Sequence, residues 1–221
     1  MLTSKALDFE TRSIAATVHG RYLVSLPRVK SRGPGPAERL LVGFHGYGEN
    51  AEAHLAQLMK IPHIDRWTLV SVQALHPFYS GRTQQIVASW MTSQDRELAI
   101  ADNKAYVRSV VAAFPTPRAL VFEGFSQGTA MAYRAASDHS RAAGLIALGG
   151  DVPPEITSSL PPVLVGRGLR DDWYSQEKFE KDLKFLKTVT SVSSLVIDGG
   201  HEWTDDFRAA AAEFLQRIAS S

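Results

Sequence analysis

The chain has 221 residues, 24 basic and 23 acidic side chains, a net charge of +1 and no cysteine. Its length suits one domain over residues 1–221, and its 44% apolar content is typical of a globular protein. The lack of cysteine excludes disulfides, thiolate metal sites and a cysteine nucleophile, and the balanced charge gives no general attraction to nucleic acid.

No run of residues approaches the roughly 18 consecutive apolar residues of a membrane-spanning helix. Residues 1–12 lack the basic start and apolar core of a signal peptide. We therefore expect a soluble, cytoplasmic protein without stable membrane insertion; the sequence leaves its oligomeric state open.

The first predicted elements are two short β-like runs at the start of the chain, residues 14–17 and 21–26. They flank His19-Gly20 and predict an antiparallel hairpin at one edge of a sheet. Six short apolar runs follow, bounded by Gly or Pro, and such runs are typical of strands buried on both faces. They are residues 39–44, 68–72, 118–123, 143–148, 162–165 and 192–197.

Segments with helical periodicity lie between these strands. They are residues 53–60 with Asn50 as N-cap, 98–114, 127–139, a helix through 179–186 with Ser175 as N-cap, and a helix through 207–218 with Thr204 or Asp205 as N-cap. Strands that alternate with helices predict an α/β fold, in which a mostly parallel sheet is covered by helices on both faces. No insertion is large enough to form a cap domain.

The sequence GFSQG at residues 124–128 fits the G-x-S-x-G nucleophile elbow, directly after a predicted strand and before a predicted helix. This turn is so sharp that it strains the backbone of Ser126 and holds its hydroxyl at the carboxyl edge of the sheet. The alternative is an ordinary turn between a strand and a helix.

A second glycine-containing loop, FHGYGEN at residues 44–50, follows an earlier strand. In a fold with a nucleophile elbow, two backbone N–H groups bind the oxyanion. One belongs to such a loop, and the other belongs to the residue after the nucleophile. We therefore predict an oxyanion hole from Tyr47 and Gln127, with His45 in a structural role.

A serine nucleophile needs a histidine base and an acid that orients it. Of the seven histidines, only His201 follows Ser126 at the end of a predicted strand, whereas His139 belongs to the helix after the elbow. The acid should follow the strand at residues 162–165, where Asp171 and Asp172 are both candidates; adjacent side chains cannot both point at one imidazole.

From residue 40 to its end, the chain resembles the phospholipase/carboxylesterase family of α/β-hydrolases, which includes acyl-protein thioesterases. The matching motifs are FHGYGEN, Ser89-Trp90, GFSQG, Gly168-Leu169-Arg170-Asp171 and Gly200-His201. The family's acid motif, H-G-x-x-D-x-x-V-P, selects Asp171 over Asp172. The chain departs from the family in the acid motif, where His, Val and Pro are replaced by Arg167, Tyr174 and Ser175. It also departs at Thr129, which replaces Gly, and at Met91-Thr92.

We therefore expect an α/β-hydrolase that cleaves a small-molecule ester or thioester through an acyl-enzyme, without cofactor or metal, on small or medium acyl groups. Two alternatives remain open. One is a lysophospholipase or acyl-protein thioesterase. The other is a non-catalytic relative that binds a small ligand or a protein.

Four side chains are further candidates for contact with substrate: Trp90, Trp173, Trp203 and His76. For each tryptophan, packing in the core or at a rim is an equal alternative. The spacing of the other histidines is not that of metal ligands, and no P-loop or complete dinucleotide motif is present.

Overall fold

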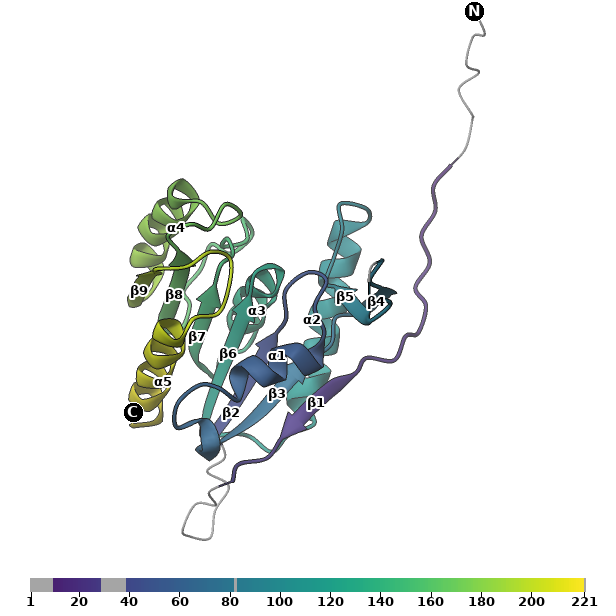
Figure 1. Ribbon diagram of the computed structural model, residues 1–221. Helices are drawn as coiled ribbons and strands as arrows, with labels where there is room; N and C mark the ends of the chain where they lie inside the picture. The colour runs from purple at the N-terminus through teal and green to yellow at the C-terminus, as the bar shows by residue number, and fades with distance from the viewer. Residues whose placement is uncertain (1–9, 29–38, 82, 221) are drawn as a thin grey trace, which may run out of the picture.

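The computed structural model describes residues 10–28, 39–81 and 83–220. Figure 1 shows a twisted central sheet with helices in front of it and behind it. The described strands are β1 (Tyr22–Ser25), β2 (Arg39–Phe44), β3 (Trp67–Val72), β4 (His76–Tyr79), β5 (Ile86–Ser89), β6 (Ala119–Phe125), β7 (Ala142–Leu148), β8 (Val163–Gly168) and β9 (Val192–Ile197).

Seven of these strands form one sheet in the order β1-β3-β2-β6-β7-β8-β9. β1 pairs antiparallel with β3, and all the other neighbours pair in parallel. The six parallel strands therefore end at one edge of the sheet, where open α/β sheets place their ligands.

The helices are α1 (Ala51–Leu58), α2 (Arg96–Ala112), α3 (Gln127–Asp138), α4 (Gln176–Val189) and α5 (Asp205–Ser220), with a short 3-10 turn, η1 (Ile64–Arg66). Two predicted caps are confirmed, because the side chains of Asn50 and Ser175 accept backbone N–H groups of the first turns of α1 and α4. At the start of α5, the Thr204 hydroxyl accepts the N–H of Phe207 at 3.3 Å.

The central strands β3, β6 and β8 are buried on both faces because successive side chains pack into two different cores. In β6, for example, Leu120 and Phe122 join the core beneath α2, α3 and α4, whereas Val121 joins the core beneath α1 and α5. Figure 1 shows α1 and α5 together on the near side of the sheet. The predicted α/β fold with helices on both faces is confirmed.

The antiparallel edge strand is also confirmed, but its predicted partner was wrong. Residues 14–17 form no strand and are exposed, and β1 pairs with β3 instead of forming a hairpin. The side chains of β3 are all buried, so this strand offers β1 a long apolar neighbour that an isolated hairpin would lack.

The sequence predicts no strand between β3 and α2, but this segment contains a second, small sheet. Here β4 and β5 pair antiparallel, with His76 opposite Ser89. A hydrogen-bonded bridge between Glu49 and Ala88 ties this ribbon to the loop after β2. The ribbon was missed because β4 is fully exposed and has no apolar alternation.

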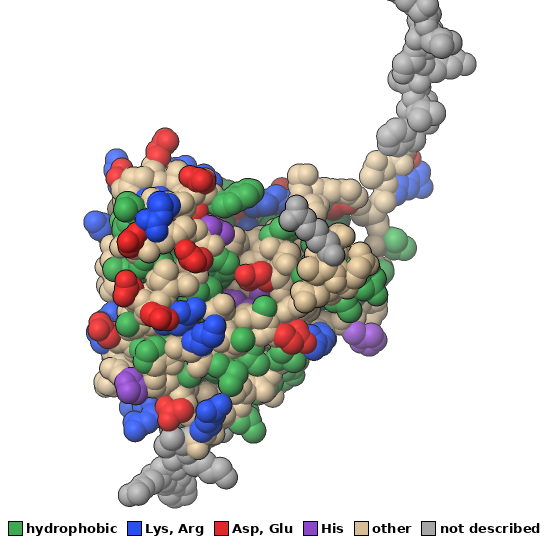
Figure 2. Space-filling model, in the orientation of Figure 1, with side chains coloured by type: hydrophobic (Ala, Val, Ile, Leu, Met, Phe, Trp, Pro, Cys, Tyr) green, Lys and Arg blue, Asp and Glu red, His purple; other side chains and the backbone are tan. Residues whose placement is uncertain are grey.

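Acidic and basic side chains are interleaved over the face shown in Figure 2, and neither sign dominates it. Among the described residues, no helix is long and apolar enough to cross a membrane.

Candidate active site

The residues predicted to carry chemistry come from four separate strand ends. Tyr47 follows β2, Ser126 follows β6, Asp171 follows β8 and His201 follows β9. Because these strands are parallel, the four loops share one edge of the sheet.

Ser126 is the tight turn between β6 and α3. It has a φ of 53° and a ψ of −121°, a strained backbone for a residue with a side chain. The glycines of the motif permit the turn, because a Cβ at Gly124 would lie 2.4 Å from the carbonyl oxygen of Gly128, and one at Gly128 would lie 2.0 Å from that of Phe44. This conformation holds the Ser126 side chain clear of both the sheet and the helix.

The structure brings Ser126, His201 and Asp171 together. The Ser126 Oγ lies 2.7 Å from Nε2 of His201, and Nδ1 of His201 lies 2.8 Å from Oδ2 of Asp171. With Nδ1 donating to the carboxylate, Nε2 is free to accept the serine proton. This arrangement can convert a hydroxyl into a nucleophile at the moment of attack.

The carboxylate of Asp171 is held from its other side as well. Its Oδ1 accepts the backbone N–H groups of Trp173 and Tyr174, each at 2.9 Å, and its side chain is only 1% exposed. Asp172 is exposed and makes no such contact with His201. The geometry thus agrees with the choice of Asp171 over its neighbour.

A buried arginine holds the loop that carries Asp171. Arg167 donates from Nε to the carbonyl of Tyr174 at 3.0 Å, and from Nη1 to the side chain of Gln176 at 2.6 Å. Its Nη2 reaches the carbonyl oxygens of Leu169 and Asp171 at 3.5 and 3.3 Å. From the sequence Arg167 is visible only as a departure from the family, because three of its four acceptors are backbone carbonyls, which carry no sequence signal.

The loop after β2 lies against the nucleophile turn. A Cβ built on Gly46 would lie 3.3 Å from the Cβ of Ser126. None of the described residues accepts the backbone N–H of Tyr47 or of Gln127, and the latter is at the first position of α3. Both predicted donors are therefore free, and the loops that carry them adjoin Ser126.

His45 fixes the peptide group that carries the N–H of Tyr47. Its Nδ1 donates to the carbonyl oxygen of Gly46 at 2.7 Å, and its Nε2 accepts the N–H of Ala74 at 3.1 Å. In a trans peptide the N–H points away from that carbonyl. Burial lowers the pKa of His45 to about 4, so the ring is neutral at pH 7, as both hydrogen bonds require. The structural role expected for His45 fits this geometry.

Trp90 braces the same loop and does not reach the substrate side. Its ring is fully buried against Phe44 and His45, and its Nε1 donates to the carbonyl of His45 at 2.8 Å. The side chain of Gln127 accepts the Trp90 N–H at 2.9 Å and donates to the carbonyl of Met91 at 2.9 Å. The hypothesis that Trp90 contacts substrate is therefore corrected to a structural role.

A cavity of about 350 Å³ opens beside Ser126 and His201. Its wall includes Gln127, Met91 and Thr129, the short run from Gly149 to Pro154, and Trp173, a residue that is 77% exposed. Trp173 is thus the one predicted contact residue that lines this cavity.

Trp203 and His76 lie elsewhere. Trp203 is buried between Phe125 and Phe207 in the core beneath α5, and His76 is an exposed residue of β4. Neither lines the cavity beside Ser126, so the structure gives no support to their assignment as substrate contacts.

One polar pair in the core was missed by the sequence analysis. His54 of α1 and Glu123 of β6 are fully buried, with Nε2 and Oε2 2.7 Å apart. Burial raises the pKa of Glu123, although His54 opposes this shift. The pair joins α1 to the strand that ends at Ser126, but its partners are 69 positions apart and no local pattern links them.

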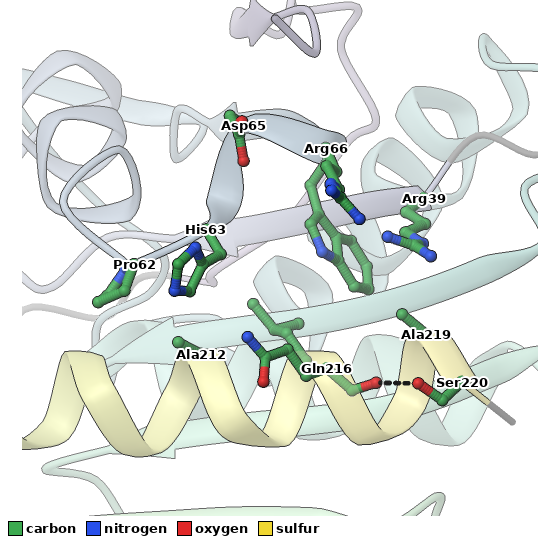
Figure 3. A pocket seen from close by; sticks show the side chains of 11 residues that line it. Arg39, Pro62, His63, Asp65, Arg66, Ala212, Gln216, Ala219 and Ser220 are labelled. Carbon is green, nitrogen blue, oxygen red and sulfur yellow. Dashed lines mark hydrogen bonds between the residues drawn. The ribbon is translucent and has the colours of Figure 1, made fainter. Parts of the chain in front are cut away.

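A separate cavity of about 420 Å³ lies at the other edge of the sheet, where the parallel strands begin. Figure 3 shows Arg39, His63 and Arg66 facing the carboxyl-terminal half of α5 across it. None of the residues predicted to carry chemistry lies there. Within the described ranges, no group of three or more His, Asp or Glu residues could hold a metal ion.

The comparisons with known proteins agree with this architecture. A family model described as Phospholipase/Carboxylesterase matches residues 27–218, and the chain belongs to this family of hydrolases. The crystal structure of esterase PE8 superposes with a TM-score of 0.72 at 23% identity, and that of Zea mays acyl-protein thioesterase 2 with 0.71 at 18%. Each match covers 91% of this chain and 100% of the other.

The Bacillus cereus carboxylesterase structure superposes with a TM-score of 0.67 at 16% identity, over 90% of this chain and 94% of that one. At these identities the structural likeness establishes the fold. A search of curated proteins finds no significant match.

Proposed function

We propose that this chain is a serine esterase that hydrolyses small or medium acyl esters or thioesters through Ser126, His201 and Asp171. Ser126 Oγ attacks the carbonyl carbon while His201 Nε2 takes the hydroxyl proton. The carbonyl oxygen becomes an oxyanion, which accepts hydrogen bonds from the backbone N–H groups of Tyr47 and Gln127. Asp171 stabilises the imidazolium that forms on His201.

Collapse of this intermediate breaks the bond to the leaving group, which takes the proton from His201, and leaves an ester between Ser126 and the acyl group. Water then enters the cavity, gives a proton to His201 and attacks the acyl carbon. Release of the carboxylic acid returns the proton to Ser126. The cycle consumes one water and needs no further reactant.

The observation that carries the proposal is the continuous hydrogen-bonded chain from Ser126 through His201 to Asp171, at 2.7 and 2.8 Å. Free backbone N–H groups in adjoining loops support it. Membership of a hydrolase family supports it independently.

The preference for small or medium acyl groups is supported by the cavity of about 350 Å³, which is near the lower end of the range for ligand pockets. Lysophospholipid or S-acylated protein, the alternative substrates, would require room for a long acyl chain. Activity on 4-nitrophenyl esters from acetate to palmitate separates them, because a short-chain esterase loses kcat/KM as the chain grows.

Hydrolysis of 4-nitrophenyl butanoate by wild type and Ser126→Ala tests the mechanism. We expect kcat to fall by about 10⁴-fold or more, since removal of a triad nucleophile leaves only binding and oxyanion stabilisation. Equal rates for the two proteins would refute the mechanism.

A further inference from the structure

The charged side chains that line the cavity beside Ser126 are not balanced. Arg96 and Lys178 are the two cations, and Asp151 is the one carboxylate. His201 also lines the cavity, but it must be neutral to accept a proton from the nucleophile. The lining therefore has an excess of one positive charge.

Lys178 is already engaged within the protein. Its Nζ lies 3.3 Å from Asp151 Oδ2 and donates to the carbonyl oxygen of Trp173 at 3.0 Å. These two contacts neutralise the lysine and hold it on the Trp173 side of the cavity. The unpaired charge is consequently that of Arg96.

Arg96 has no carboxylate within 4 Å among the described residues. The charge of Arg96 does affect the pKa of Glu155. Burial raises this pKa, but hydrogen bonds from the backbone and from Arg134, together with the charges of Arg134 and Arg96, lower it below its ordinary value. Glu155 accepts Nε of Arg134 at 2.7 Å, so the carboxylate that is affected by the charge of Arg96 is already paired with another guanidinium group.

Arg134 lies behind the wall of this cavity and is paired with Glu155. Its side chain is 1% exposed, and Nη1 lies 3.7 Å from the sulfur of Met91, which lines the cavity. Its Nη2 is buried and has no hydrogen-bond partner among the described residues. Because Arg134 and Glu155 form an ion pair, their charges offset each other, and the excess positive charge on this side of the cavity remains that of Arg96.

The position of Arg96 is tied to the reaction centre. It is the first residue of α2, and the segment that leads to it starts at Trp90 and Met91, which are hydrogen-bonded to the side chain of Gln127. Gln127 directly follows Ser126. Because Arg96 and Ser126 also line the same cavity, of about 350 Å³, one substrate molecule can place an anionic group at Arg96 and its carbonyl at Ser126.

We propose that the cavity selects esters that carry an anionic group, a carboxylate or a phosphate, and that Arg96 binds this group. This inference rests on the proposed esterase function and names its substrate class. The anion is on the acyl side in monoesters of dicarboxylic acids, and on the alcohol side in esters of a phosphorylated alcohol.

Two matched substrate pairs distinguish these sources. The acyl pair is mono-4-nitrophenyl adipate and 4-nitrophenyl hexanoate, which share a six-carbon chain and differ in the terminal carboxylate. The alcohol pair is 1-butanoylglycerol 3-phosphate and 1-butanoylglycerol. For each pair the measured quantity is the ratio of kcat/KM for the anionic ester to that for the neutral one, after subtraction of spontaneous hydrolysis.

In at least one pair, we expect wild type to favour the anionic ester about fivefold, the effect of one ion pair at an exposed arginine. Arg96→Gln should bring that ratio close to one, Arg96→Glu should reverse it, and added salt should weaken it in wild type. Arg141→Gln is the matched control, because exposed Arg141 precedes β7 at the opposite edge of the sheet and its loss should leave the ratio unchanged.

The proposal would be overturned if the kcat/KM ratio of wild type were near one in both pairs. It would also be overturned if Arg96→Gln left a preference for the anionic ester unchanged. If the neutral esters are still cleaved in a Ser126-dependent way, only the substrate class is wrong. If Ser126→Ala cleaves them as fast as wild type, the proposed function itself fails.

Discussion

At the scale of single residues, Asp171 and Asp172 show what separates two chemically identical neighbours. Spacing along the chain allowed either carboxylate to face His201. In the structure Asp171 is buried and accepts two backbone N–H groups, whereas Asp172 is exposed. The family motif indicated the same choice, but the residues alone could not, because burial depends on how the loop is folded against its neighbours.

We predict that Asp171→Asn lowers kcat by about 10⁴-fold, because an amide stabilises the wrong tautomer of His201 and cannot balance the imidazolium. Asp172→Asn makes the same chemical change one position away and should leave kcat within about twofold, as expected of an exposed polar side chain without partners. Steady-state kinetics on 4-nitrophenyl butanoate measures both. A larger loss at Asp172 would show that the acid has been assigned to the wrong residue.

At the scale of elements, the strands, helices and two helix caps of the parallel part were predictable because each has a local pattern. The exceptions were long-range: β1 pairs with β3 rather than with residues 14–17, and β4 and β5 form an exposed ribbon. The sequence also did not predict that Arg167 supports the loop of Asp171, because Arg167 binds backbone oxygens that only the fold brings together.

Arg167→Lys tests this support, because lysine keeps the charge but has no fork of donors for several carbonyls. We expect kcat to fall roughly 10- to 100-fold with KM nearly unchanged, because Asp171 would shift relative to His201 while the cavity wall stays in place.

Arg170→Lys is the control for that variant. Arg170 is in the same loop, but its side chain is 65% exposed and pairs with Asp198 at the surface. Its kcat and KM should match those of wild type. A rise in KM with unchanged kcat in Arg167→Lys would assign Arg167 to substrate binding instead.

At the scale of the whole molecule, the site is built on a sheet that is packed on both faces. Polar groups buried in this packing make the free energy of unfolding depend on pH. The pKa of His45 is lowered by burial to about 4, against an ordinary value of 6.5. A histidine with a depressed pKa in the folded state stabilises the fold fully above pH 6.5, and this contribution is lost as the pH falls toward 4.

We predict that His45 alone removes about 3 kcal/mol from the free energy of unfolding between pH 7 and pH 4. In urea denaturation, His45→Gln should therefore be less stable than wild type at pH 7 and closer to it at pH 4.5. His19→Gln, at an exposed histidine, should follow the wild-type pH dependence. Parallel curves for wild type and His45→Gln would mean that His45 is not buried in its neutral form.

The central claim, that Ser126 is an activated nucleophile, is tested most directly by fluorophosphonate labelling followed by intact-mass and peptide analysis. We predict one adduct per chain, on Ser126, that is absent in Ser126→Ala and forms far more slowly in His201→Gln. The account would be contradicted by no labelling of wild type, or by an adduct of equal mass and rate in Ser126→Ala.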